Sequence, residues 1–547
     1  MCGLGLVFSK KDKIPHNLIK IAENDLGLRG PSHATHYLGD DIYMYQSVLA
    51  IQTEPDRDDG FASLPQNFDV TLYNGEIYDD HEHDSDIEML QKSSAKQLVL
   101  GRCDGMFAVI QAQRHGQWLD ITALRDIHGE KRIFYYDSPR VLILASTPSF
   151  ILKVMEEFDE PVTLNEVALK DYFVTRHYIS NSTAISGIYQ VPPGSKFHFN
   201  KYSSVTQVWT PRKYLNSELT RELNNTTPGQ YTHYLEELII RTLKKMQSSV
   251  RPHVNVYSTV SGGTDSSIVT KLLENIGTQL IRGITLTFDE KDSVALFADK
   301  LFDKLYTGQV VRNIDRESYH ESYLQTLKLC CSPIPSHDFA SANLLYEMLE
   351  PGSILYGGEG ADELFLGYKY YQNCVRSEYS MAVRNNFKLS FSENIQEDYE
   401  YAFQFFIDNL YSTKDAHIKA CSFVDFFHQM PNATLMSGDL IGSSHGIETR
   451  TPFTRKDIVT YAINSPPYLL DNKRPLSKIF ENHYQRRPYA KIGFSGHPNE
   501  MYRYLENGID KSYEIYGSYV QSPYNDRDTE WKYINTEFFL DTFCFTP

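Results

Sequence analysis

A cysteine stands second in the chain, directly after Met1. If Met1 is removed, Cys2 carries a free α-amine, whose ordinary pKa is about 7.7–8.0, beside its thiol. The amine can then accept the thiol's proton, so that one residue supplies both nucleophile and base. Taken alone, however, a cysteine at this place is more often an inert packing residue.

Three residues further along could serve such a nucleophile. Asn74 and Gly75 follow an apolar run, and a side-chain amide beside a glycine N–H is a donor pair suited to an oxyanion. Asp86 offers a carboxylate to an incoming ammonium group. The same residues also fit a hairpin turn at Asn-Gly and a helix N-cap at Asp86, so neither pattern decides the matter by itself.

A second kind of chemistry is indicated at residues 261–267, which read SGGTDSS between a strand-like run and a helical pattern. Glycines let backbone N–H groups approach a phosphate, and a helix N-terminus adds the positive end of its dipole. Ser266 and Ser267 would add hydroxyl donors. Asp265 would repel a bare phosphate, which predicts a bridging Mg²⁺. The segment lacks the Walker pattern, and its alternative interpretation is a serine-capped turn.

A similar loop follows the strand-like run 354–356, where residues 357–363 read GGEGADE. Three glycines and three carboxylates make a poor helix interior but suit a loop at the carboxyl end of a strand, where open α/β sheets bind ligands. Asp362 could share a metal with Asp265, and Glu359 could act as a base or hold an amine. The alternative is a solvated acidic turn.

Elements of two kinds must position these residues. Short apolar runs between turn signals predict a β-rich first part of about 200 residues. The polar stretch 206–230 is typical of a linker. Helices alternating with strands then predict a parallel sheet, and residues 370–547 are mostly helical in pattern. The runs concerned are 70–73, 107–111, 133–136, 141–145, 231–247, 254–260 and 354–356.

The composition excludes several classes of protein. The chain has 547 residues, enough for two to four domains at about 150 residues each. A net charge of -17 makes nucleic acid a poor default partner, because no basic excess exists to release counterions. No apolar run approaches the roughly 18 residues of a membrane span, and the start lacks the basic region of a secretory signal. Seven scattered cysteines without CxxC pairs predict a reducing, cytoplasmic setting.

Together these features resemble the glutamine-hydrolysing asparagine synthetase family over nearly the whole chain. The most specific motifs are SGGTDSS at 261–267 and GGEGADELFLGY at 357–368. Further motifs occur in the family's order: MCG at 1–3, RGP at 29–31, NGEIY at 74–78, DGMFA at 104–108, RDIHGEK at 125–131, VPPG at 191–194, HGIETRTPF at 445–453, Lys473 before PLSK, and the closing segment 531–543. The segment 445–453 looks like the family's helix-to-loop connection.

The resemblance implies an α/β fold. An N-terminal αββα sandwich of the Ntn-hydrolase type would be followed by a doubly wound parallel-sheet PP-loop ATPase domain with a helical C-terminal region. The implied domains are a class II glutamine amidotransferase (glutaminase) domain at 1–205, a linker at 206–230, and an asparagine synthetase-like ATP-pyrophosphatase domain at 231–547.

The resemblance also implies an activity: asparagine made from aspartate with ammonia from glutamine, through β-aspartyl-AMP, with ATP as co-substrate and Mg²⁺ as cofactor. The partners would be small molecules, not nucleic acid or membrane, and a homodimer stays open. Implied roles are catalysis for Cys2, Asn74, Gly75, Glu359 and Lys473; glutamine binding for Asn74, Glu76 and Asp86; ATP or pyrophosphate binding for Ser261, Gly262, Gly263, Asp265, Ser266, Ser267, Leu286 and Gly358; and metal binding for Asp265 and Asp362.

The chain departs from the family's pattern in three places. The family usually has an arginine that grips the glutamine carboxylate, but the corresponding stretch here is YQSVL at 45–49, without Arg or Lys. Serine or glutamine does not replace a bidentate guanidinium, so another cation such as Arg57 would be needed. Ser32 stands where the family commonly has Asp, and Tyr489 with Ala490 looks inserted, which loosens the register of Lys473.

Two alternatives remain open. The same adenylation could act on another carboxylate, as in β-lactam synthetases or peptide cyclases, although those enzymes often lack the cysteine. A degenerate family member could instead bind or regulate without catalysis. Intact Cys2, Asp265, Glu359 and Asp362 favour an amide ligase that uses ammonia.

Overall fold

The computed structural model describes residues 2–51, 70–79, 86, 103–116, 118–178, 181–277, 281–287, 301, 308–372, 393–409, 411–488, 501–506, 508–517 and 527–545. The predicted Arg57 and the 489–490 insertion lie outside these residues.

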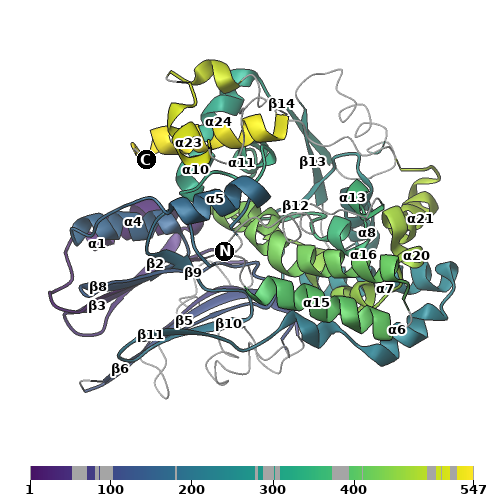
Figure 1. Ribbon diagram of the computed structural model, residues 1–547, viewed down its shortest axis with the longest axis horizontal. Coiled ribbons are helices and arrows are strands. Elements are labelled where there is room, and N and C mark those ends of the chain that lie inside the picture. Colours follow the sequence, from purple (N-terminus) through teal and green to yellow (C-terminus); the bar gives the residue numbers. More distant parts are fainter. Residues whose placement is uncertain are drawn as a thin grey trace.

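The first part of the chain forms two antiparallel sheets that face each other (Figure 1). Every strand pair in them is antiparallel. The first sheet has the order β2 (Ser32–Tyr37), β3 (Ile42–Val48), β1 (Cys2–Ser9), β8 (Val141–Ala145), β7 (Phe134–Asp137) and β9 (Ile188–Gln190). The second has the order β11 (Ser203–Gln207), β10 (Ser195–Phe199), β6 (Trp118–Arg125), β5 (Gly105–His115) and β4 (Val70–Ile77). The predicted sandwich of sheets is therefore confirmed.

The apolar side chains of the strands divide between two faces. Leu4, Leu6 and Met44 of the first sheet pack against Leu72 and Ile110 of the second, which makes the core between the sheets. Residues pointing the other way from the first sheet pack against α1 (Leu18–Asp25) and α4 (Pro148–Glu157), because successive strand residues face opposite sides. This layering leaves the amino end of β1 inside the molecule.

The stretch expected to be a linker contains ordered structure. It holds the 3₁₀ helix η3 (Pro211–Tyr214) and α6 (Ser217–Asn224). Trp209 and Tyr214 are buried, and the Tyr214 ring stacks on Phe427 with centroids 5.3 Å apart. Although residues 206–230 are mostly polar, a few buried aromatic residues therefore attach this segment to the second half.

The second half is built on a parallel sheet with the order β14 (Gly308–Asn313), β13 (Ile281–Thr287), β12 (Val256–Thr259), β15 (Ser353–Tyr356) and β16 (Ile447–Arg450). All its strand pairs are parallel, as predicted. Strand β12 lies between β13 and β15. The chain adds β13 and β14 on one side of β12, and later β15 and β16 on the other side, so the direction of winding reverses at β12. Such a switch point opens a crevice at the carboxyl ends of the strands.

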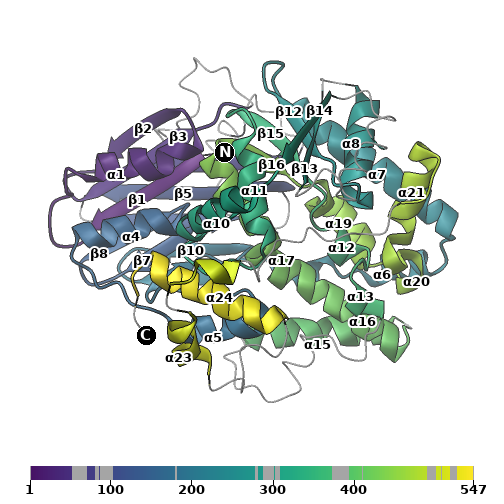
Figure 2. The same cartoon turned by 90° about the horizontal axis from the view of Figure 1, so that it is seen from above.

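Helices surround this sheet and make up most of the chain's last third (Figure 2). The helix α7 (Pro228–Ser248) begins with a capping box between Thr227 and Gln230. The others are α8 (Thr264–Ile276), α10 (Arg316–Cys330), α11 (Asp338–Glu347), α12 (Ala361–Leu364), α13 (Lys369–Gln372), α15 (Glu393–Asp408), α16 (Thr413–Val424), η4 (Asp425–Gln429), α17 (Met430–Asn432), α18 (Thr434–Met436), η5 (Ser437–Gly442), η6 (Pro452–Thr454), α19 (Lys456–Ile463), α20 (Pro467–Leu470), η7 (Asp471–Lys473), α21 (Arg474–Tyr484), η8 (Tyr502–Tyr504), α23 (Asp510–Tyr516) and α24 (Arg527–Thr542).

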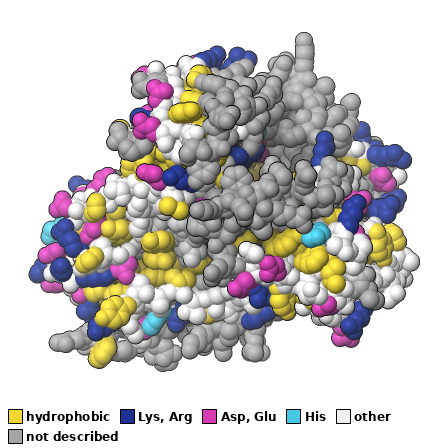
Figure 3. Space-filling view, viewed as in Figure 1, with side chains coloured by type: hydrophobic (Ala, Val, Ile, Leu, Met, Phe, Trp, Pro, Cys, Tyr) yellow, Lys and Arg dark blue, Asp and Glu magenta, His cyan; other side chains and the backbone are white. Residues whose placement is uncertain are grey.

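The last helices return to the first half. Tyr516 of α23 packs on Phe173 of α5 (Glu166–Thr175), with ring centroids 4.5 Å apart. On the face shown in Figure 3, acidic and basic side chains are scattered among one another. Among the described helices, none combines the length and the apolar character needed to cross a bilayer.

Candidate functional site

Cys2 lies at the amino end of β1, between the two sheets, and is 8% exposed. Its backbone N donates a hydrogen bond of 2.7 Å to Asn74 Oδ1 on the facing sheet. Its carbonyl oxygen accepts one of 3.1 Å from Arg29 Nε. The next residue is also fixed, since Gly3 N donates to Ser47 Oγ at 2.9 Å. The cysteine is therefore held at a defined place inside the sandwich.

Asn74 and Gly75 come at the carboxyl-terminal part of β4, beside Cys2. Asn74 is fully buried, and its Nδ2 has no hydrogen-bond partner among the described residues. Gly75 has φ 137°, and a Cβ there would lie 1.9 Å from the carbonyl oxygen of Met106. The backbone thus requires glycine at this point. An amide with unused donors beside the cysteine is what an oxyanion site needs.

Of the two carboxylates expected to hold an ammonium, Glu76 belongs to β4 and Asp86 lies against that strand. Asp86 Oδ2 accepts hydrogen bonds of 2.9 Å from the Tyr73 hydroxyl and from Ile77 N. Glu76 Oε1 lies 3.3 Å from Arg450 Nη2 of the second half. Burial, together with Glu448, raises the pKa of Glu76 in spite of this arginine. Glu76 is therefore poised at the boundary of the two halves.

The stretch that replaces the family's arginine is occupied by hydrogen bonds to the backbone. The Gln46 amide donates to Tyr73 O at 2.9 Å and accepts from Tyr73 N at 3.3 Å. Ser47 Oγ accepts from Gly3 N and donates to Leu26 O at 2.6 Å. Both side chains tie neighbouring segments together, and neither supplies a cation.

The second group of predicted residues gathers at the switch point of the parallel sheet. Gly263 is the N-cap of α8 and has no side-chain capping bond, which leaves the first N–H groups of the helix to an anion. Ser261 Oγ and Ser266 Oγ lie 3.1 Å apart at the mouth of the loop. Ser267, by contrast, is fully buried and donates to Gly263 O at 2.6 Å. Its hydroxyl supports the loop from beneath.

Asp265 and Asp362, predicted to share a metal, converge on one side chain. Lys473 Nζ lies 2.5 Å from Asp265 Oδ2 and 2.7 Å from Asp362 Oδ1. Burial alone would lower the pKa of Lys473, but the two carboxylates raise it above its ordinary value. The ammonium therefore bridges two loops that are about 100 residues apart in the sequence.

The donor set fits magnesium. Two carboxylate oxygens already meet around one positive charge, and Mg²⁺ is commonly held by one or two carboxylates together with substrate phosphates. Among the described residues, no cluster of three or more His, Cys, Asp or Glu side chains is arranged to hold a metal. The protein would thus supply part of the coordination and a nucleotide the rest.

Two further predicted residues, Gly358 and Glu359, lie in the loop after β15. A Cβ on Gly358 would lie 2.8 Å from Asp265 Cβ, so the glycine lets this loop pack closely on the start of α8. Glu359 Oε2 is shielded from solvent and has no partner among the described residues. This desolvation, and then the nearby Asp265, raise the pKa of Glu359.

Leu286 lies near the carboxyl end of β13 and is 5% exposed. Its side chain packs in the hydrophobic core with Tyr257 and Leu355. The structure thus brings this residue to the correct edge of the sheet, with its side chain directed into the core.

A family model described as asparagine synthase matches residues 237–542, more than half of the chain, and one described as a glutamine amidotransferase domain matches residues 1–210. The chain belongs to the asparagine synthase family.

One similar curated protein is asparagine synthetase [glutamine-hydrolyzing] 1 of Bacillus subtilis (strain 168), 23% identical over 403 residues. The match covers 68% of this chain and 60% of that protein. Two solved structures are also similar, each at 10% sequence identity. The allosteric regulatory enzyme of purine biosynthesis matches with a TM-score of 0.27 over 57% of this chain and 80% of that one. Glutamine phosphoribosylpyrophosphate amidotransferase from B. subtilis, in complex with ADP and GMP, matches with a TM-score of 0.28 over 56% of this chain and 90% of that one.

In this asparagine synthase family member, one important residue was not predicted from the sequence. Asp439 of η5 accepts from Arg29 Nη2 at 2.8 Å through Oδ1 and from Arg132 N at 2.9 Å through Oδ2. Because Arg29 also holds the carbonyl of Cys2, Asp439 connects the second half directly to the cysteine. The only sequence signal was Arg29 itself, within the RGP motif.

A small cavity of about 30 Å³ lies between the halves. Glu130 and Lys131 line it from the first half, and Glu359, Asp439 and Thr449 from the second. It thus adjoins both the Arg29–Asp439 pair and the glutamate of the nucleotide site.

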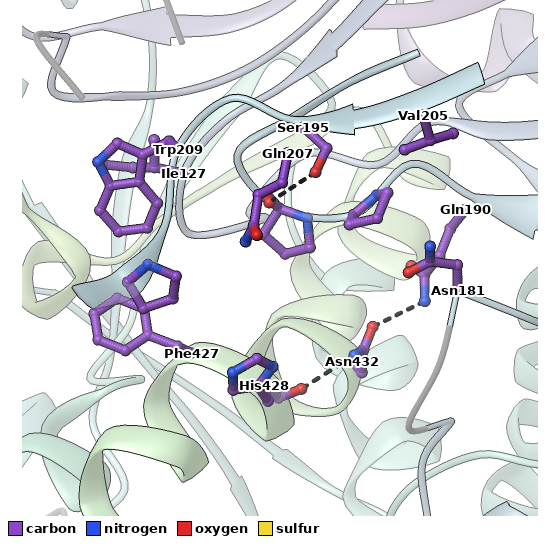
Figure 4. A pocket seen from close by; sticks show the side chains of 13 residues that line it. Ile127, Asn181, Gln190, Ser195, Val205, Gln207, Trp209, Phe427, His428 and Asn432 are labelled. Carbon is purple, nitrogen blue, oxygen red and sulfur yellow. Dashed lines mark hydrogen bonds between the residues drawn. The ribbon is translucent and has the colours of Figure 1, made fainter. Parts of the chain in front are cut away.

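A separate cavity of about 280 Å³ also lies between the halves (Figure 4). Trp209 and Phe427 form one side of it. The Gln190 amide reaches across to Asn432 with a hydrogen bond of 2.9 Å. None of the predicted site residues lines this cavity.

Proposed function

We propose that the protein is a glutamine-dependent amide ligase that makes asparagine from aspartate, with residues 1–205 acting as the glutaminase, 231–547 as the ATP-pyrophosphatase domain and 206–230 joining them. Free cysteines, five of the six described ones buried, suit the cytoplasm as its location. The observation that carries the proposal is the convergence of Asp265, Asp362 and Lys473 at the carboxyl ends of β12 and β15, in a chain whose other half encloses Cys2 beside Asn74.

In the first reaction, once Met1 has been removed, the Cys2 thiol passes its proton to its own α-amine, and the thiolate attacks the side-chain amide carbon of glutamine. Asn74 Nδ2 and the Gly75 N–H stabilise the oxyanion. The carbon–nitrogen bond then breaks, ammonia leaves with the proton returned, and water hydrolyses the thioester to glutamate. Glu76 and Asp86 hold the substrate's ammonium group in this scheme.

In the second reaction, the side-chain carboxylate of aspartate attacks the α-phosphate of ATP, and pyrophosphate leaves. The amides at the start of α8, with Ser261 and Ser266, hold the phosphates. Magnesium bound by Asp265 and Asp362 would neutralise phosphate charge. Ammonia next attacks the β-aspartyl carbonyl and AMP leaves, while Glu359, whose pKa is raised by burial, takes the surplus proton.

Ammonia must travel from one site to the other as the neutral molecule. The cavity of about 30 Å³ between Lys131 and Glu359 is large enough for a molecule of that size. Passage through the interior also keeps bulk water from the acyl-adenylate.

The deciding experiment measures pyrophosphate release from ATP with aspartate, using glutamine or ammonium as the nitrogen donor. Release with aspartate and either donor supports the proposal. Release only with another carboxylic acid would support a β-lactam synthetase-like or cyclase-like ligase, and no release with any acid would support a regulatory protein. Cys2→Ala should abolish glutamine use and spare ammonium use, whereas Cys103→Ala, a buried thiol of the same half, should spare both.

A further inference from the structure

The position of Lys473 is defined by the backbone as well as by its charge. Asn472 and Lys473 both have left-handed backbone angles, with φ 51° and 57°. Lys473 N donates to Phe365 O at 2.9 Å, which ties it to the loop that carries Asp362. Two successive non-glycine residues in this region are strained, and such strain persists only where the surroundings hold it. The backbone of Lys473 is thus held in place beside the two carboxylates.

The neighbouring loop is shaped to admit this lysine. A Cβ on Gly367 would lie 2.2 Å from Lys473 Cε and 2.2 Å from Asp362 Oδ1. With the two side chains in these positions, a Cβ at residue 367 would overlap both of them. The Lys473 side chain is 9% exposed, and those of Asp265 and Asp362 are 16% and 13% exposed. The three charges therefore meet in a largely dry place where attraction is strong.

We propose that Lys473 is a built-in substitute for the metal. In the protein without nucleotide, its ammonium bridges Asp265 and Asp362, and the metal–nucleotide complex displaces it from between them. The inference rests on the proposed function, since it assumes that these two aspartates are the metal ligands. It adds an order to that function: a divalent cation alone competes poorly with the tethered ammonium, and the lysine becomes available to the reacting groups only once the metal has arrived with the phosphates.

The contrast with the buried pair of Arg29 and Asp439 supports an exchangeable role. Arg29 makes hydrogen bonds to both a carboxylate and two backbone carbonyls, so its guanidinium is held on several sides. Within the described part of the chain, the ammonium of Lys473 pairs only with the two aspartates, and both belong to the proposed nucleotide-binding loops. A flexible lysine also gives up such contacts more readily than a planar arginine.

The test measures Mn²⁺ binding to the full chain without nucleotide. Binding is monitored through the electron paramagnetic resonance signal of the free ion. Lys473→Met removes the competing charge and should tighten Mn²⁺ binding by about tenfold or more. Lys473→Arg, which keeps the charge, should bind as weakly as the wild type. Lys478→Met, an exposed lysine on the next helix, is the matched control and should change nothing. Unchanged or weaker binding by Lys473→Met would overturn the proposal.

A measurement on the wild type covers the case in which that variant does not fold. Mg²⁺ alone should leave the unfolding temperature unchanged, whereas Mg²⁺ with ATP should raise it; a rise with Mg²⁺ alone would overturn the proposal. The outcomes separate this inference from the proposed function. If ATP does not tighten Mn²⁺ binding to the wild type, the proposed nucleotide site fails, whatever Lys473→Met does.

Discussion

At the scale of single residues, Asn74 has two tasks that depend on each other. Its Oδ1 accepts the hydrogen bond from Cys2 N, so the orientation of the amide is fixed. The Nδ2 group is then directed elsewhere and stays without a partner among the described residues. In the proposed glutaminase reaction, one side chain would thereby position the nucleophile and offer a donor to the oxyanion.

Removal of the Asn74 Nδ2 donor should affect the glutamine-dependent reaction only. We expect Asn74→Ala to lower the glutamine-dependent kcat by about 10²–10³-fold, the usual effect of losing an oxyanion donor, and to leave ammonium-dependent synthesis unchanged. Asn165→Ala, which removes a helix cap in the same half, is the control for general destabilisation. Equal losses with both nitrogen donors would show that Asn74 is only structural.

Gly75 allows a steric prediction with its own control. Gly75→Ala places a methyl group 1.9 Å from Met106 O at φ 137°, so we expect a destabilisation of about 2–4 kcal/mol. Gly116→Ala also has a positive φ, 61°, but meets no atom within 4 Å, and should cost about 1 kcal/mol. Thermal unfolding of both variants measures the difference. Similar shifts for the two would show that the close approach at Gly75 can relax.

At the scale of elements, the sequence predicted apolar strands such as 354–356, but it did not predict the charged strand β16. Strand β16 reads IETR, and the sequence interpretation expected a helix-to-loop connection there. Glu448 and Arg450 are nonetheless buried, because they pair with each other at 2.8 Å and Arg450 also contacts Glu76. A partner from the other half makes these charges tolerable inside, and no local pattern contains that partner.

The two glycine loops were predictable for the opposite reason. In SGGTDSS and GGEGADE, the residue types that the chemistry needs also determine the local backbone, so the pattern is short and complete. The site residues beyond these loops depend on distant contacts. The sequence therefore indicated that Lys473 belongs to the site, but not that it lies between the two aspartates.

Helix α16 has a lysine at a buried position, and this predicts that the stability of the protein depends on pH. Lys419 is fully buried, and its Nζ donates to Ala462 O at 2.9 Å. Burial lowers the pKa of Lys419 to about 7. The unfolded chain binds the proton more tightly, so stability falls as the pH drops from about 10.5 to about 7 and levels off below that.

Lys419→Met should therefore stabilise the protein at pH 7 by roughly 3 kcal/mol and flatten its stability between pH 7 and 10. Lys414→Met, an exposed lysine on the same helix, should do neither. Unfolding temperatures recorded across this pH range are the measurement. If the two variants gave the same profile, Lys419 would have to be charged and compensated in the folded state.

At the scale of the whole molecule, the two halves are joined by buried charges. Arg455 pairs with Glu130, and the Thr451 hydroxyl donates to the same glutamate at 2.7 Å. Arg29 pairs with Asp439 across 410 residues of sequence. Breaking a buried pair by removing one partner is strongly destabilising, so these contacts fix how the halves meet. They also lie between the two proposed active sites.

Asp439→Asn tests whether this connection couples the reactions. Burial would raise the pKa of Asp439, but Arg29, Lys131 and Arg132 lower it, so the carboxylate is charged and opposes three cations. The neutral amide of the variant holds Arg29 less firmly than the carboxylate does. The carbonyl of Cys2, which Arg29 binds, is then also held less firmly. We expect a stability loss of about 3–5 kcal/mol and glutamate formed in excess over asparagine, with ammonium-dependent synthesis retained.

The readout is the ratio of glutamate to asparagine produced in one reaction mixture. Asp457→Asn removes an exposed carboxylate that pairs with Arg241 at 3.3 Å and should leave the ratio unchanged. Arg29→Lys supplies a second variant should the first not fold, because lysine keeps the charge but cannot bond to Cys2 and Asp439 together. A ratio that stays near one while stability falls would mean that the Arg29–Asp439 pair only holds the two halves in place. Coupling of the reactions requires that a change at Asp439 affect Cys2 through Arg29, because Arg29 binds both residues.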